Sequence, residues 1–318
     1  MSKNILIIAA KLAVTSGLMY LVLRDVELES LHARVGSLSS FPLICAAALV
    51  FFQYIVVVTW RWERVVAAID RAVPPWRLMK IVVIALFFNQ VLPSTVGGDG
   101  MRVWLLRGQG RSIGLAFRSV LIDRLIGFFG ALLLALIGAL YLMAVLEDPG
   151  PGWFLALVSL SGLVLIAAAP LLIRGLGWLP ARAVRRSLEN IAREVDLLAR
   201  DKARLTMLIG SSILGQIALG GSVFLLAQGL GISLNPIGVL AVVPGIIIVS
   251  TIPISIAGWG VREGTMVVGL GLLGVARGDA ALVSIAFGLV SLLLGLLGGI
   301  FWLIHRGQPP ARAEWEGR

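Results

Sequence analysis

Two stretches of the chain share an unusual spacing of proline, glycine and arginine, and each lies inside an otherwise apolar run. Both read Pro-x4-Gly-x-Gly-x-Arg, first at residues 93–102 and again at residues 253–262. The glycines permit positive φ angles and close approach of another backbone, and their free N–H groups can hold an anion. The arginines add forked donors that suit a phosphate. The members of this motif are Pro93, Gly98, Gly100 and Arg102 in the first copy and Pro253, Gly258, Gly260 and Arg262 in the second.

Three acidic residues lie near the two copies. Asp99, Asp123 and Glu263 can each pair with an arginine, or bind a proton or cation. Asp123 and Arg124 are expected to form a structural ion pair with each other at the cytoplasmic start of a span. An alternative interpretation is that the glycines serve tight helix packing and that a neighbouring acid neutralises each arginine. Because the motif occurs as a matched pair, we favour binding of an anionic headgroup.

Polar and aromatic residues complete the surroundings of the breaks. Asn89 and Ser255 are among the side chains that can satisfy freed backbone groups or line a polar path. Tryptophans fall mostly at the ends of apolar stretches, as with Trp60, Trp62 and Trp76, where anchoring at the membrane interface accounts for them.

The composition predicts a polytopic membrane protein. Hydrophobic residues make up 58% of the 318 residues and charged residues only 14%, which is far from the composition of a soluble domain. The net charge of +10 comes from basic residues beside apolar stretches, so topology explains it and no nucleic acid is expected. One cysteine and two histidines do not support a metal site, and no cofactor is expected.

Six stretches are long enough to cross the hydrocarbon core, which takes about 20 helical residues. They are residues 5–23, 41–60, 125–146, 153–173, 205–228 and 280–304. Residues 61–80 and 174–204 are rich in arginine and lysine, whereas 147–152 and 229–236 have neither. The first two segments are therefore predicted to be cytoplasmic and the other two to lie outside.

This assignment makes both motif regions re-entrant. Residues 81–107 would enter and leave on the cytoplasmic face, and residues 237–276 on the outer face, as in an inverted repeat of broken helices. The alternative for the second region is two ordinary spans, with the C-terminus outside. The predicted fold is thus all-α, with about six spans, two re-entrant helical hairpins and both termini in the cytoplasm.

The membrane domain is expected to cover residues 1–307. Within it, residues 181–204 show apolar positions at a three-four spacing and predict an amphipathic helix at the cytoplasmic interface. The tail, residues 308–318, is rich in proline and charge and is expected to be disordered.

Enzyme activity is not expected. The chain has no Walker loop and no histidine near a serine or cysteine nucleophile. One alternative is a membrane component of lipid-linked glycosyl or aminoacyl transfer, with Asp99 or Glu263 as a base. Another is a structural subunit of an envelope lipid complex.

Three motifs in order resemble a known family. They are residues 87–93 with 97–102, then 123–125, then Pro253 with 258–264. Together they are similar to the lysylphosphatidylglycerol synthase transmembrane domain, also called the flippase-like family, over roughly residues 5–305. The resemblance implies lipid translocation across the inner membrane. It also implies a lipid ligand, and a second copy or a separate lipid-modifying enzyme as protein partner. Because the soluble synthase domain of that family is not part of this sequence, we expect no synthase activity.

Overall fold

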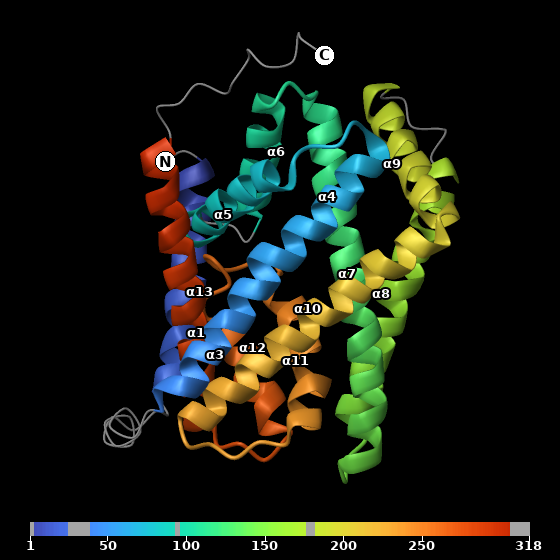
Figure 1. Cartoon of the computed structure of the whole chain (residues 1–318). Coiled ribbons are helices and arrows are strands. Elements are labelled where there is room, and N and C mark those ends of the chain that lie inside the picture. Colours follow the sequence, from blue (N-terminus) through green and yellow to red (C-terminus); the bar gives the residue numbers. More distant parts are fainter. Residues whose placement is uncertain (1–2, 25–38, 93–95, 176–181, 306–318) are drawn as a thin grey trace.

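The chain is a bundle of helices, seen in a computed structural model that describes residues 3–24, 39–92, 96–175 and 182–305 (Figure 1). The first half contains α1 (Lys3–Leu23), α3 (Ser40–Phe51), the π-helix η1 (Phe52–Val57), α4 (Val58–Ile69), α5 (Pro75–Val91), α6 (Gly97–Gly108) and α7 (Ile113–Val145). The second half contains α8 (Gly150–Gly175), α9 (Arg182–Arg200), α10 (Lys202–Gly229), α11 (Pro236–Ser250), α12 (Val261–Gly271) and α13 (Arg277–His305).

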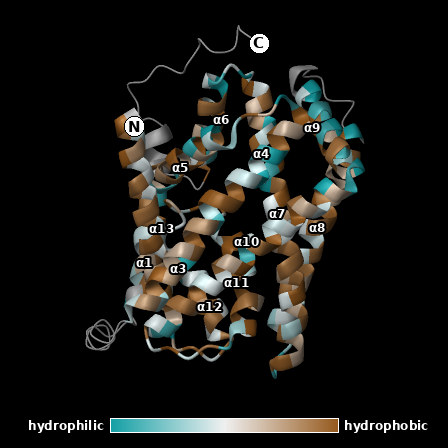
Figure 2. Cartoon of the chain, viewed as in Figure 1, coloured by the Kyte–Doolittle hydropathy of each residue, from teal (hydrophilic) through white to brown (hydrophobic). Residues whose placement is uncertain are grey.

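Among the described residues, five helices are long and apolar enough to cross a membrane: Ser40–Ile69, Ile113–Val145, Gly150–Gly175, Lys202–Gly229 and Arg277–Ile304. The predicted first span is a shorter apolar helix, Ala10–Val22. Hydrophobic residues dominate the middle of the bundle, whereas hydrophilic residues gather on α9 and α6 at one end (Figure 2). The protein is therefore an all-α polytopic membrane protein, as the composition predicts.

Two predicted boundaries are wrong. Residues 61–80 are not a cytoplasmic loop, because α4 continues to Ile69 and α5 begins at Pro75. Likewise α7 begins at Ile113, twelve positions before the predicted span at 125. The predicted spans end at charged residues because charges lower the local hydropathy. A helix can continue past such residues where their charges are paired inside the protein.

The two motif regions form helical hairpins that open toward opposite ends of the bundle (Figure 1). The α5–α6 hairpin enters and leaves at the end that carries α9, and the α11–α12 hairpin enters and leaves at the other end. The helices α11 and α12 have 15 and 11 residues, which span about 22 and 16 Å and cannot cross a hydrocarbon core of about 30 Å. Both regions are therefore helical hairpins, as predicted, and their re-entrance into the membrane stays a prediction.

The glycines of the first motif have different roles. The backbone N–H of Gly98 donates to Asn89 Oδ1 at 2.8 Å, so the end of α5 caps the start of α6. A Cβ at Gly98 would overlap the carbonyl oxygen of Ala85, whereas a Cβ at Gly100 would meet no heavy atom within 4 Å. Close approach therefore requires Gly98 but not Gly100. Pro93 lies outside the described residues.

The glycines of the second motif form the turn between α11 and α12. Gly258 and Gly260 have φ angles of 80° and 87°, which only glycine adopts without strain. Gly260 also lies against α1, since a Cβ there would be 2.7 Å from the Cβ of Leu18. Pro253 lies exposed in the same turn.

The predicted amphipathic helix is α9, and its apolar side packs on the bundle. Ile191, Ala192 and Leu198 are buried, and Leu198 belongs to a cluster with residues of α4, α7 and α10. Arg118 of α7 also binds Glu194 of α9, with 2.8 Å between Nε and Oε1. The helix α9 therefore packs against the ends of α4, α7 and α10.

The difference in packing between Gly98 and Gly100 predicts different effects of their substitution by alanine. Gly98→Ala should lower the free energy of unfolding by about 1–3 kcal/mol, because the new methyl group overlaps α5. Gly100→Ala should leave it unchanged or raise it by up to about 1 kcal/mol, since alanine favours a helix and the space is open. Thermal unfolding of the purified protein in detergent measures both. Equal destabilisation by the two substitutions would contradict the packing described.

The opposed hairpins predict labelling from opposite sides. Arg107 ends the first hairpin and Ser233 precedes the second, and both are exposed. In a Cys45→Ala background, Arg107→Cys should react with a membrane-impermeant maleimide from one side of oriented vesicles and Ser233→Cys from the other. Reaction of both cysteines from the same side would rule out the arrangement.

Candidate functional site

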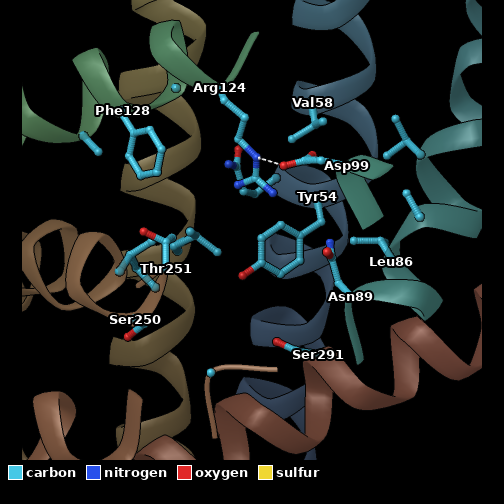
Figure 3. Close-up of a pocket in the computed structure, with 18 of the residues that line it drawn as sticks. Tyr54, Val58, Leu86, Asn89, Asp99, Arg124, Phe128, Ser250, Thr251 and Ser291 are labelled. Carbon is cyan, nitrogen blue, oxygen red and sulfur yellow. Dashed lines mark hydrogen bonds and ion pairs between the residues drawn. The ribbon is translucent and has the colours of Figure 1, made fainter. Parts of the chain in front are cut away.

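A cavity of about 240 Å³ lies inside the bundle and is lined by residues of both hairpins (Figure 3). Its walls come from η1, α4, α5, α6, α7, α10, α13 and the second hairpin. The polar residues that line it are Gln53, Tyr54, Arg61, Asn89, Gln90, Asp99, Arg102, Asp123, Arg124, Gln216, Ser250, Thr251, Arg262 and Ser291. A cavity with so many charged residues among membrane-spanning helices is a candidate ligand site.

Asp123 is the centre of a buried ionic cluster. Its Oδ1 accepts from Nε of Arg61 at 2.7 Å, and its Oδ2 accepts from Nη2 of Arg102 at 2.7 Å. Arg61 also donates through Nη1 to Ser212 Oγ at 3.1 Å. The Asp123 side chain is fully buried. One carboxylate thus joins α4, α6 and α7, and Arg61 extends the contact to α10.

A second carboxylate of this cluster, Asp99, binds Arg124. The distance between Arg124 Nε and Asp99 Oδ2 is 2.6 Å, and Arg102 Nη1 lies 3.4 Å from Asp99 Oδ1. The expected ion pair between Asp123 and Arg124 is therefore wrong. Both residues pair outside α7 instead, Asp123 with Arg61 of α4 and Arg102 of α6, and Arg124 with Asp99 of α6. Arg124 is the most accessible of these charges, because 35% of its side chain is exposed.

Arg102 also lies on an aromatic ring. Its guanidinium carbon is 4.2 Å from the centroid of Trp62. Trp62 is fully buried and donates through Nε1 to Ser119 Oγ at 3.2 Å, so its prediction as an interfacial anchor is wrong. The tryptophan supports the arginine through a cation–π contact that a buried position strengthens.

In the second hairpin the motif arginine pairs with its sequence neighbour. Nε of Arg262 lies 3.1 Å from Oε1 of Glu263, and Oε2 of Glu263 accepts the backbone N–H of Gly260. The guanidinium carbon of Arg262 is 4.6 Å from the ring centroid of Trp259. Glu263 is fully buried. Arg262 thus lines the cavity with its charge compensated locally.

The charges around the cavity do not cancel. The cluster of the first hairpin contains Arg61, Arg102 and Arg124 against Asp99 and Asp123, and the second hairpin contributes the neutral pair of Arg262 and Glu263. One positive charge is left, and it belongs to the cluster of the first hairpin. An excess of guanidinium groups in a site away from bulk water favours an anionic ligand.

Ten of the predicted site residues fall into two groups. Those that line the cavity are Asn89, Asp99, Arg102, Asp123, Arg124, Gly258 and Arg262. Gly98, Gly260 and Glu263 shape the hairpin tips behind it, through the contacts described above. Ser255 is fully buried, and its hydroxyl has no hydrogen-bond partner among the described residues.

Sequence reasoning missed Arg61, Gln53, Tyr54 and Gln216. Arg61 carried a signal, since it stands between Trp60 and Trp62 at the end of an apolar run and could have been recognised as an intramembrane arginine. The other three give no such signal, because a single polar residue in a span is common. Within the described ranges, no group of three or more histidine, cysteine, aspartate or glutamate residues lies close enough together to hold a metal ion.

Comparison with known proteins assigns the chain to a family. Residues 8–299 match the family described as the lysylphosphatidylglycerol synthase TM region. The chain belongs to this family. It is also similar to a UPF0104 membrane protein of Methanothermobacter thermautotrophicus, with 29% identity over 94 residues. That alignment covers 29% of this chain and 27% of the relative. The family membership confirms the resemblance carried by the two hairpin motifs.

The central position of Asp123 predicts a large loss of stability on its neutralisation. Asp123→Asn leaves two buried arginines without their main partner and should cost about 3–5 kcal/mol of unfolding free energy. A matched control is Asp196→Asn, which removes an ion pair with Arg174 at the surface and should cost at most about 1 kcal/mol. Chemical unfolding in detergent measures both.

A double variant tests whether the loss comes from the ion pair. If it does, Asp123→Asn combined with Arg61→Gln should cost less than the sum of the two single substitutions. Strict additivity would show that Asp123 and Arg61 act independently.

Proposed function

We propose that this protein is a lipid transporter of the inner membrane, which translocates a polar or anionic lipid. The observation that carries the proposal is a cavity with an excess of arginine, enclosed between two re-entrant hairpins that open toward opposite ends of the bundle. Broken helices that meet inside a membrane protein, in an inverted arrangement, form the substrate sites of many transporters. The family membership supports a role that involves lipid.

The physical problem of lipid transport is the passage of a charged headgroup through hydrocarbon. An unpaired charge there costs several kcal/mol. Forked donors of Arg102 and Arg124 at the wall of the cavity can replace the water around a phosphate. Acyl chains need no such replacement, because the surrounding lipid is as apolar as they are.

The proposal also covers the orientation of the protein in the membrane and its lack of enzyme activity. The end that carries α9 would be cytoplasmic, with both termini on that side, because this helix is rich in arginine. Both carboxylates that line the cavity are held by arginines, so neither is available as a general base, and the protein would not be an enzyme. A lipid is the proposed ligand; a second copy of the chain or a separate lipid-modifying enzyme is the proposed protein partner.

Transport should depend on Arg124. In proteoliposomes of phosphatidylcholine, Arg124→Gln should slow the translocation of acyl-labelled phosphatidylglycerol at least about tenfold, the effect of one lost charge-assisted hydrogen bond. The matched control is Arg118→Gln on the same helix, since Arg118 binds Glu194 and does not line the cavity. Dithionite quenching of the outer leaflet measures the rate.

Two further controls accompany this experiment. Both variants must unfold at the temperature of the wild type, so that a lost rate is not lost protein. Lipid masses before and after incubation should be identical, because covalent change would favour lipid-linked transfer instead. Translocation by Arg124→Gln at the wild-type rate, or by neither wild type nor control, would refute the proposal.

A further inference from the structure

The two hairpins are attached to the rest of the bundle in different ways, and this difference identifies the part of the cavity wall that can move. Resting on the proposed function, we infer that the turn of the second hairpin, residues 251–260, is a gate for the lipid headgroup and that α1 is the latch that holds it closed. Because the acyl chains of a lipid stay in the hydrocarbon, its headgroup has to enter such a cavity sideways, past an element of the wall that moves.

The turn contacts both the cavity and α1. The residues of the turn that line the cavity are Thr251, Ala257 and Gly258. Those on either side of Ala257 and Gly258 contact α1 instead: the backbone N–H of Ile256 donates to Thr15 Oγ1 at 3.0 Å, and a Cβ at Gly260 would be 2.7 Å from that of Leu18. One irregular turn therefore forms the wall between this part of the cavity and α1.

The backbone of the turn is strained. Ala257 has a φ angle of 52°, which is costly for a residue with a side chain, and Gly258 and Gly260 are also at positive φ. Residues 252–254 are exposed, so they contribute little to apolar packing. A segment with few buried side chains and without regular helical hydrogen bonds opens more readily than the helices beside it.

The helix α1 is itself peripheral. None of its residues from 10 to 22 is buried, and its packing partners are α12 and α13. Figure 1 shows it at the edge of the bundle, next to α13. A helix with so little buried surface can move away from the turn at low cost.

The ion pairs also favour movement of the second hairpin over the first. Arg102 of α6 binds Asp123 of α7 at 2.7 Å, so an opening of the first hairpin would separate a buried ion pair, which is expensive. Arg262 and Glu263 both belong to α12 and bind each other. Their pairing therefore remains intact when the second hairpin moves.

Hydrogen exchange tests the latch without a transported lipid. Thr15→Val removes the acceptor of the Ile256 N–H and keeps the shape of the side chain. Amide exchange over residues 252–260, followed by mass spectrometry, should become about fivefold faster, the effect of one lost hydrogen bond. Residues 97–102 of the first hairpin should exchange as before. The matched control is Thr15→Ser, which retains the acceptor and should exchange like the wild type. Equal exchange in Thr15→Val and wild type would overturn the latch.

A reversible cross-link tests the gate. The hydrogen bond between Thr15 and Ile256 limits the distance between their Cα atoms to about 7 Å. In a Cys45→Ala background, Thr15→Cys/Ile256→Cys can therefore be joined by a short bis-methanethiosulfonate. In proteoliposomes, the joined protein should translocate acyl-labelled phosphatidylglycerol at least about tenfold more slowly, because the gate cannot open. Dithiothreitol should restore the rate.

A matched cross-link and the exchange data separate this inference from the proposed function. Leu43→Cys/Gly229→Cys joins α3 to α10, where a Cβ at Gly229 would be 3.4 Å from Leu43 Cγ, and should leave the rate unchanged. Unchanged translocation by the joined Thr15 and Ile256 pair, or equal slowing by the control, would overturn the gate and leave lipid transport intact. A folded wild type that translocates no anionic lipid would refute the proposed function, whereas the exchange result for the latch would still stand.

Discussion

The paired charges around Asp123 are the constraint on which the rest of the structure depends. An arginine or aspartate without a partner is expensive inside a membrane protein, and here one carboxylate binds arginines from two other helices. This pairing of all three charges requires α4, α6 and α7 to lie next to one another. These ion pairs help to position α6 of the first hairpin, which brings Asp99 and Arg102 to the wall of the cavity.

The two hairpins share a sequence pattern but are attached to the bundle differently. Arg102 binds an acid on another helix, whereas Arg262 binds its neighbour Glu263 and packs against Phe287 of α13. The second turn is bound instead through apolar packing and through Thr15 of α1, whose Oγ1 accepts the backbone N–H of Ile256 at 3.0 Å. The repeat in the sequence is thus a repeat of backbone geometry, and the chemistry of each half depends on which acids the neighbouring helices offer.

The features that sequence predicts well are those that a short segment carries by itself. The hairpins follow from apolar stretches too short to span and from the charge of the loops beside them, and the positive φ of Gly258 and Gly260 follows from the turn. Partners far apart in the chain are not predictable in this way. Arg61 and Asp123 are separated by 62 positions, and Arg61 ended an apolar run where a loop was expected. Gly98 and Gly100 look equivalent in the motif, yet only the packing of α5 shows that one is required and the other is not.

The π-helix η1 connects the fold to the site. Its five-residue hydrogen bonding makes each turn wider than in an α-helix, so consecutive side chains diverge less. Gln53 and Tyr54, neighbours in η1, accordingly both line the cavity, together with Arg61 farther along the same continuous helix. Such segments are less stable than α-helix and are found frequently at functional sites. The wide turn places the amide of Gln53 and the phenol of Tyr54 at the cavity that also contains the arginine cluster.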